Sequence, residues 1–209
     1  MQKKFWNSYG AWDEIAKSDD INFVMSRITG KPVEKWRVNH LSDTARAAMA
    51  TVIGEGVIRQ GPSLGVLDFG CGVGRNAGLL KTMYGRVYGC DIPEMLEQIK
   101  GKDPIKARDL YEGFYTSLQD AFKDNTIHTL YDSVVFQHII DADFNAAAAE
   151  AVHSHESLDC HFSLTNKSVG ETLLIKQLKS RGWKITHEEV DVESFLGSPH
   201  IVYIMRRPG

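Results

Sequence analysis

An aspartate followed by three alternating glycines is the feature of this chain best suited to binding a ligand. The residues are Asp68, Gly70, Gly72 and Gly74. Glycine adopts positive φ angles at low cost and has no side chain, so such a loop can turn sharply and lie close to a ligand. In βαβ proteins the ligand at this place is usually nucleotide-like. We therefore expect a nucleotide-like ligand at residues 68–74.

The loop must be positioned by a strand before it and a helix after it. Val66, Leu67 and Phe69 form the short apolar run of a central parallel strand, and a helical pattern follows Gly74. The glycine spacing differs from the dinucleotide motif G-x-G-x-x-G, because Gly78 comes one residue too late. A phosphate-binding loop would need Lys and then Ser or Thr directly after its last glycine, and no such pair directly follows Gly74 or Gly78. The spacing therefore favours a third kind of nucleotide site.

A carboxylate at the end of the second predicted strand fits the same kind of ligand. The segment RVYGCD, residues 86–91, ends in Asp91, and Pro93 suits the first turn of the next helix. A carboxylate at a strand tip can accept hydrogen bonds from two ribose hydroxyls. Taken alone, Asp91 could equally be a solvated turn residue. Next to the glycine loop, we interpret it as a ribose ligand.

The segment LDFGCGVGRN, with the acid at residue 91, resembles the first motifs of the class I S-adenosylmethionine-dependent methyltransferases. The resemblance covers roughly residues 43–209. It implies an α/β fold: a Rossmann-like, mostly parallel seven-stranded sheet with an antiparallel last strand and helices on both faces. The implied cofactor is S-adenosyl-L-methionine, which leaves as S-adenosyl-L-homocysteine. The implied cofactor-binding residues are Asp68, Gly70, Cys71, Gly72, Gly74, Asp91, Ile92, Asp109, Leu110 and Phe136.

The chain before the sheet is predicted to form a separate element. Residues 1–42 are interpreted as an N-terminal helical extension or cap, and residues 43–209 as the methyltransferase domain. In similar enzymes such a segment folds over the cofactor and shapes the acceptor pocket, which makes Tyr9 and Trp12 candidate substrate-pocket residues. The alternative is that these aromatic side chains only cover core surface. An apolar periodicity predicts a helix over residues 43–58.

Five further strands are predicted after the second helix. They cover residues 105–110, 131–140, 158–165, 183–192 and 200–205, and the last two resemble the antiparallel pair that closes this fold. By resemblance, Asp109 at the end of the first of these strands contacts the adenine amino group. Ser168 and Glu171 form a capping box that predicts the start of a helix.

The expected chemistry requires mainly positioning, because a sulfonium carries its own activated methyl group. A general base helps only where the acceptor is protonated. By resemblance, Gln137 and His138 lie on the acceptor side after the fourth strand. His138 is the candidate catalytic base because histidine titrates near neutrality. The alternative for His138 is a strand-end histidine bonded to the backbone.

We expect methyl transfer to an oxygen or nitrogen of an unidentified small molecule. The motif (Asn/Asp)-Pro-Pro-(Tyr/Phe) of nucleobase methylases is absent after the fourth strand, where VFQHII stands. The alternative function is a non-catalytic S-adenosylmethionine-binding or regulatory module, which would keep the cofactor residues but lack an open acceptor pocket. A nicotinamide oxidoreductase is disfavoured by the glycine spacing and by the absence of a Tyr-x-x-x-Lys pair.

Composition argues against several other classes. A formal net charge of −3 with scattered basic residues disfavours a nucleic-acid partner. No apolar run approaches the ~20 residues of a membrane span, and no signal peptide is evident, so we expect a cytoplasmic protein without membrane contact. The three cysteines form no C-x-x-C pair and are expected to be reduced thiols. No metal site is expected, although His153 and His155 form a His-x-His pair and His161 follows.

Overall fold

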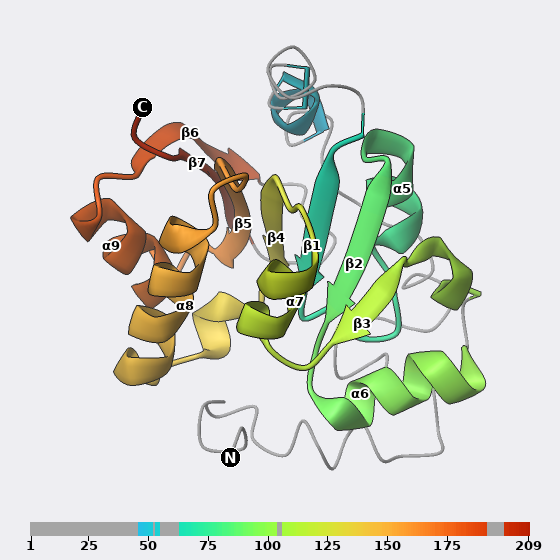
Figure 1. Cartoon of the computed structure of the whole chain (residues 1–209). Helices are drawn as coiled ribbons and strands as arrows, with labels where there is room; N and C mark the ends of the chain where they lie inside the picture. Colours follow the sequence, from blue (N-terminus) through green and yellow to red (C-terminus); the bar gives the residue numbers. More distant parts are fainter. Residues whose placement is uncertain (1–45, 52, 55–62, 104–105, 192–198) are drawn as a thin grey trace.

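The computed structural model describes residues 46–51, 53–54, 63–103, 106–191 and 199–209. Its centre is one sheet of seven strands in the order β3-β2-β1-β4-β5-β7-β6. Figure 1 shows β1 and β4 in the middle of the molecule with helices packed around the sheet. The strands are β1 (Gly65–Phe69), β2 (Arg86–Cys90), β3 (Gly113–Tyr115), β4 (Thr129–Ser133), β5 (Cys160–Asn166), β6 (Lys184–Asp191) and β7 (His200–Arg206).

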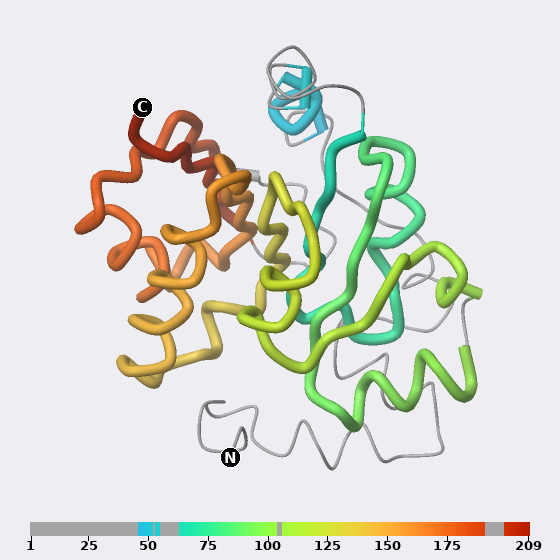
Figure 2. Tube along the Cα trace, viewed as in Figure 1, coloured from blue at the N-terminus to red at the C-terminus, as the bar shows by residue number. Residues whose placement is uncertain are grey.

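The last strand in the chain is the one that runs against its neighbours. β1 pairs in parallel with β2 and β4, β2 pairs in parallel with β3, and β4 with β5. β7 lies between β5 and β6 and is antiparallel to both. The predicted class, a mostly parallel seven-stranded sheet with an antiparallel last strand, is confirmed. Figure 2 traces the path of the chain through this sheet.

Two apolar clusters cover the two faces of the sheet. α5 (Ala77–Met83) contributes Ala77 and Leu80 to one cluster. α7 (Leu118–Asp124), α8 (Ala142–Ser154) and α9 (Leu173–Ser180) contribute to the other. Because both faces are covered, all five residues of β1 are buried, as expected of a central parallel strand. One of them is Asp68, so the fold buries a carboxyl group at its centre.

α6 (Pro93–Glu97) follows β2 and carries Pro93 in its first turn, as predicted. It continues as a π-helical turn, Gln98–Lys102. The predicted third strand at residues 105–110 is wrong: Arg108–Leu110 is a 3-10 turn, and the strand comes later, at Gly113–Tyr115. The reason is local, because the Asp103 carboxylate accepts hydrogen bonds from the backbone N–H groups of Ala107 (2.8 Å) and Arg108 (3.0 Å).

The fourth strand is also shorter than predicted, since it ends at Ser133 instead of continuing to residue 140. Val134 has φ 61°, a left-handed conformation that a β-branched residue rarely adopts. The buried Asp132 carboxylate holds this turn. Its Oδ1 accepts hydrogen bonds from the N–H groups of Val135 (2.9 Å) and Phe136 (3.2 Å). The apolar residues 134–136 therefore leave the sheet and lead into a 3-10 turn, Phe136–His138.

Two further expectations concern helices. The capping box at Ser168 and Glu171 is wrong, because Thr172 caps α9 by accepting from the N–H of Ile175 at 3.3 Å. Ser168 instead donates to Asn166 Oδ1 at 2.7 Å. Within the predicted helix at 43–58, residues 46–51 and 53–54 are helical. The predicted extension at 1–42, with Tyr9 and Trp12, lies outside the described residues.

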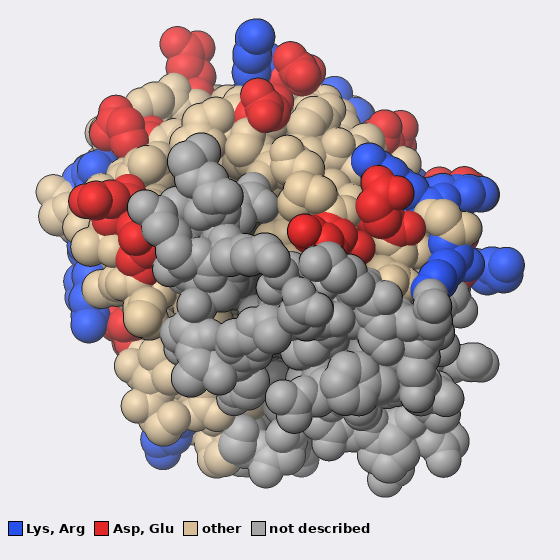
Figure 3. All heavy atoms as spheres, turned by 90° about the horizontal axis from the view of Figure 1, so that it is seen from below, with Lys and Arg blue, Asp and Glu red and all other residues tan. Residues whose placement is uncertain are grey.

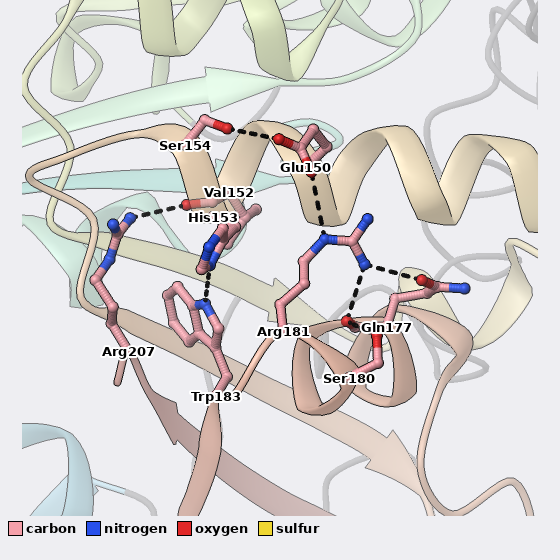
Figure 4. Close-up of polar contacts among 9 residues, drawn as sticks. All are labelled: Glu150, Val152, His153, Ser154, Gln177, Ser180, Arg181, Trp183 and Arg207. Carbon is pink, nitrogen blue, oxygen red and sulfur yellow. Dashed lines mark hydrogen bonds and ion pairs between the residues drawn. The ribbon is translucent and has the colours of Figure 1, made fainter. Parts of the chain in front are cut away.

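Arg207 fastens the end of α8 to the end of the chain (Figure 4). Its Nε donates to the carbonyl of Leu158 at 2.8 Å, and its Nη2 donates to the carbonyls of Val152, at 3.2 Å, and His155. The guanidinium also lies 5.6 Å from the ring centroid of Trp183. A cation at a helix C-terminus that satisfies open carbonyls stabilises the helix end.

We expect Arg207→Ala to lower the free energy of unfolding by about 2–3 kcal/mol, because several half-buried carbonyls lose their donor and the ring contact is lost. Arg207→Lys should recover only part of this loss, since an ammonium cannot reproduce the planar fork. Urea denaturation measures both variants. The control is Arg181→Ala. The Arg181 guanidinium lies 3.4 Å from the exposed Glu150 and donates to one backbone carbonyl among the described residues, that of Gln177, at 3.0 Å, so the loss should be about 1 kcal/mol. Equal losses at the two arginines would contradict this prediction.

Candidate cofactor and acceptor site

The glycine loop between β1 and α5 folds by means of three left-handed residues. Gly70, Gly72 and Gly74 have φ angles of 72°, 57° and 87°. A Cβ at Gly70 would lie 2.3 Å from Val135 Cγ2, and a Cβ at Gly74 would lie 2.5 Å from Ala107 Cβ. At these two positions the missing side chain makes room for neighbouring side chains of the protein itself.

Asp91 follows β2 directly and joins the loop to the second strand. Its Oδ2 accepts from the N–H of Gly72, and its Oδ1 accepts from the N–H of Ile92, each at 2.7 Å. Burial raises the pKa of Asp91 to about 6, although both N–H donors lower it. The carboxylate is therefore ionised above that pH. Each of its oxygens can accept a second hydrogen bond, so ribose hydroxyls could bind without displacing the loop.

Asp68 in β1 lies on the other side of the loop and is 1% exposed. The hydroxyl of Tyr111 donates to its Oδ2 at 2.7 Å, whereas Oδ1 has no hydrogen-bond partner among the described residues. Burial raises the pKa of Asp68 to about 7, while Tyr111 and Arg75 lower it. An orphaned carboxylate oxygen inside the protein is suited to a cationic ligand group.

A cavity of about 180 Å³ lies against this loop. One wall consists of the ends of β1 and β2, including Gly70, Asp91 and Ile92. The other walls are residues 116–119 after β3 and the residues Ile139, Phe144, Ala147 and Ala148 near and in α8. The cavity is mostly apolar with carboxylate and backbone groups at one end, which fits a nucleoside.

Residues 116–119 were missed by the sequence reasoning, which placed the third strand too early. One signal was available, because Ser117 and Asp120 have the spacing of a helix cap. Ser117 does cap α7 by accepting from the N–H of Asp120 at 3.1 Å. This cap places a strand end just before residue 117, where the cavity wall begins.

Comparison with known proteins agrees with this geometry. Residues 67–154 match the family model of a methyltransferase domain. This protein carries a methyltransferase domain over these residues. It is therefore an enzyme, and solved structures with the same fold contain S-adenosylmethionine or S-adenosylhomocysteine. A search of curated proteins found no match.

Solved structures share the fold of this methyltransferase. Magnesium protoporphyrin IX methyltransferase (ChlM) from Synechocystis PCC 6803 with bound S-adenosylhomocysteine has a TM-score of 0.58 at 18% identity, covering 99% of this chain and 97% of that one. N-methyltransferase NodS from Bradyrhizobium japonicum WM9 has a TM-score of 0.56 at 12% identity, covering 97% and 100%. The methyltransferase domain of bacterial CtHen1 has a TM-score of 0.54 at 17% identity, covering 78% and 97%. These identities establish the fold alone.

The structure does not bring all predicted cofactor residues of the methyltransferase to the cavity. Gly70, Asp91 and Ile92 line it. Phe136 stacks on the lining residue Phe69 with ring centroids 4.5 Å apart. Asp109 precedes β3; its side chain is 87% exposed and lies 3.3 Å from Arg108 Nε.

The remaining predicted cofactor residues do not line the cavity: Asp68 is in β1, Cys71, Gly72 and Gly74 are in the loop, and Leu110 comes before β3. Leu110 packs against the apolar cluster on the α5 face. Cys71 is buried in the loop, and burial raises the pKa of its thiol well above the usual range. A thiol kept protonated is a poor nucleophile, which fits a packing role for Cys71.

Gln137 and His138, which were predicted to lie on the acceptor side, are in the 3-10 turn after β4 and do not line the cavity. Gln137 Oε1 accepts from the N–H of Asn166 at 2.7 Å, so its amide nitrogen must be the donor to His138 Nε2 at 3.0 Å. The proton of the neutral imidazole is then on Nδ1. Burial lowers the pKa of His138 to about 4, so the ring is neutral at physiological pH.

The other histidines make different contacts. His155 Nε2 accepts from the N–H of Ile127 at 3.2 Å, and Trp183 donates to His153 Nδ1 at 3.2 Å (Figure 4). His161 is fully buried, and burial lowers its pKa to about 3. No group of three or more His, Cys, Asp or Glu side chains among the described residues is arranged to hold a metal ion. None of the described helices is long and apolar enough to cross a membrane.

Proposed function

We propose that this methyltransferase transfers the methyl group of S-adenosylmethionine to an oxygen or nitrogen of a small molecule. The observation that carries the proposal is the Asp91 carboxylate, which is fixed by two backbone N–H groups at the wall of the cavity. In this arrangement Asp91 binds the ribose hydroxyls of the cofactor. The apolar cavity between Ile92 and Leu118 holds its adenine ring, and Oδ1 of Asp68 accepts from its ammonium group.

The cofactor supplies an activated methyl group, so the residues of the chain need only bind, orient and exclude water. The loop and the turn after β4 contribute to orientation together, since Val135 fills the space left by Gly70. The turn carries Gln137 and His138 to the acceptor side. His138 is neutral and could accept a proton, provided that Gln137 releases its Nε2 atom.

Two observations favour a small acceptor. The turn after β4 reads Phe-Gln-His-Ile, which is not the motif of nucleobase methylases. Figure 3 shows acidic and basic side chains intermixed around the described part of one face, and the net charge is −3. A nucleic-acid partner would favour a continuous basic surface.

Calorimetric titration tests the cofactor assignment. We expect saturable binding of S-adenosylmethionine and S-adenosylhomocysteine and none of NADH. Binding of NADH alone, or of none of the three, would contradict the proposal. A screen of small alcohols, phenols, amines and carboxylic acids with labelled methyl donor then identifies the acceptor class.

We expect His138→Ala to leave cofactor affinity within about twofold and to lower turnover roughly 100-fold, the lower end of general-base effects. At saturating cofactor, protonation of His138 should not affect the turnover of the unaltered enzyme above pH 6, because the pKa of His138 is about 4 and the ring is already neutral there. Steady-state rates across pH measure both. Unchanged turnover in His138→Ala would show that His138 is a packing residue. The enzyme would then promote methyl transfer by positioning the substrates, without a general base at this residue.

A further inference from the structure

Tyr111, in the segment before β3, has a side chain that reaches the buried Asp68. It is 8% exposed, and its hydroxyl donates to Asp68 Oδ2 at 2.7 Å across a sequence separation of 43 residues. The ring passes beside the glycine loop, since a Cβ at Gly74 would come within 3.3 Å of Tyr111 Cε2. The sequence pointed instead to Asp109, whose side chain is 87% exposed.

Two further contacts hold Tyr111 in place. The ring packs on Phe114, with centroids 5.0 Å apart, and the backbone N–H donates to the carbonyl of Arg108 at 3.2 Å. Burial and the neighbouring Asp68 raise the pKa of Tyr111 well above the usual range, so the phenol keeps its proton and remains a donor. A fixed neutral donor can hold one carboxylate oxygen and leave the other, here a buried oxygen, without a hydrogen bond.

We propose that Tyr111 is a positioning residue for cofactor binding: its hydroxyl holds Oδ2 of Asp68 and leaves Oδ1 to accept from the ammonium group of the cofactor. This inference rests on the proposed function, in which Asp68 binds that ammonium. Nothing in the motif of the glycine loop specifies this residue, because the contact comes from a distant part of the chain.

The hydrogen bond also controls how much of Asp68 is ionised. Burial raises the pKa of Asp68 to about 7, whereas the donor Tyr111 lowers it. The other groups that act on this carboxyl are Arg75 and Asn76, which lower its pKa, and Asp91, which raises it. The neighbours Tyr131, Cys71 and Cys90 all have raised pKa values and stay neutral. Loss of the hydroxyl therefore shifts Asp68 further toward its protonated form.

Tyr111→Phe is the direct test, with S-adenosylhomocysteine as the probe and calorimetry from pH 6.5 to 8.5 as the measurement. We expect affinity to fall roughly tenfold at pH 7 and by a smaller factor at pH 8.5, as Asp68 regains its charge. The result at each pH is the ratio of the affinity of Tyr111→Phe to that of the unaltered chain. Both proteins bind the same ligand at the same pH, so the titration of the ligand's own amine cancels in this ratio. The matched control is Tyr84→Phe. Tyr84 is also buried, and its hydroxyl donates to Thr129 Oγ1 at 3.1 Å, away from Asp68.

A second measurement uses the unaltered chain, so it does not depend on how a variant folds. 5′-Methylthioadenosine has the nucleoside but lacks the ammonium group. As pH rises through about 7, we expect the affinity for S-adenosylhomocysteine to rise relative to the affinity for 5′-methylthioadenosine. Only S-adenosylhomocysteine has an ammonium group that can bind ionised Asp68. In an Asp68→Asn background, Tyr111→Phe should produce no further pH-dependent change.

The outcomes separate the two proposals. If the unaltered chain binds neither S-adenosylmethionine nor S-adenosylhomocysteine, the proposed function fails and this inference fails with it. If it binds both but Tyr111→Phe leaves the pH profile unshifted, or lowers affinity equally at every pH, the inference alone is overturned. The inference is also overturned if Tyr84→Phe shifts the pH profile of affinity as much as Tyr111→Phe does.

Discussion

Replacing Asp91 with alanine is expected to weaken S-adenosylmethionine binding by roughly 10–100-fold. The substitution removes charge-assisted hydrogen bonds worth ~1.5–3 kcal/mol and also leaves the N–H groups of Gly72 and Ile92 without their acceptor. Calorimetric titration at pH 8 measures the loss, because Asp91 has a pKa of about 6 and is ionised there. In the unaltered enzyme, affinity should decline as pH falls through about 6 and the carboxylate takes up a proton.

Asp109→Ala is the informative companion to this variant. The sequence-based interpretation predicts a loss of cofactor affinity for both aspartates. The structure predicts a loss for Asp91 only, since the Asp109 side chain is 87% exposed. Circular dichroism should show both variants folded. Wild-type affinity in a folded Asp91→Ala variant would remove Asp91 from the cofactor site.

Gly74→Ala is expected to lower the free energy of unfolding by about 2–4 kcal/mol. Gly74 has φ 87°, and an added Cβ would lie 2.5 Å from Ala107 Cβ and 2.9 Å from Ile99 Cδ1. Left-handed strain, at about 1–2 kcal/mol, acts together with overpacking of a buried site, at about 1–3 kcal/mol, part of which the loop relieves by shifting. Urea denaturation measures the change. The cofactor should bind this variant more weakly as well, because the loop can accept the methyl group only by shifting.

Gly78 provides the matched control in the next helix. It lies within α5, and an added Cβ would meet nothing within 4 Å. Gly78→Ala should therefore raise stability by about 0.5–1 kcal/mol, the usual gain from replacing a helical glycine. The two variants make the same chemical change four residues apart, and we expect opposite signs. Equal effects would mean that the left-handed loop carries no constraint at Gly74.

The parts of the site that depend on local pattern could be predicted. An apolar run followed by alternating glycines places β1 and the loop, and an acid after the next short strand places Asp91. These features lie within a few residues of one another, so periodicity and turn chemistry are sufficient.

The parts that depend on distant contacts could not be predicted. The hydrogen bond from Tyr111 to Asp68 joins residues 43 positions apart, and neither segment has a sequence pattern that predicts it. Val134 shows a second limit. Valine strongly favours strands, yet Asp132 holds the next two N–H groups and turns the chain out of the sheet at that residue. The turn that carries Gln137 and His138 follows from that departure.

The position of β7 between β5 and β6 has a consequence for synthesis. β6 lies at the edge of the described sheet and pairs with β7, which follows it in the chain. As the protein is translated, β6 leaves the ribosome before the strand that will join it to the sheet. The edge of β5 is unpaired at that stage as well. The nascent chain therefore carries unpaired edges on both β5 and β6 until residue 206 has emerged, and unpaired strand edges favour aggregation.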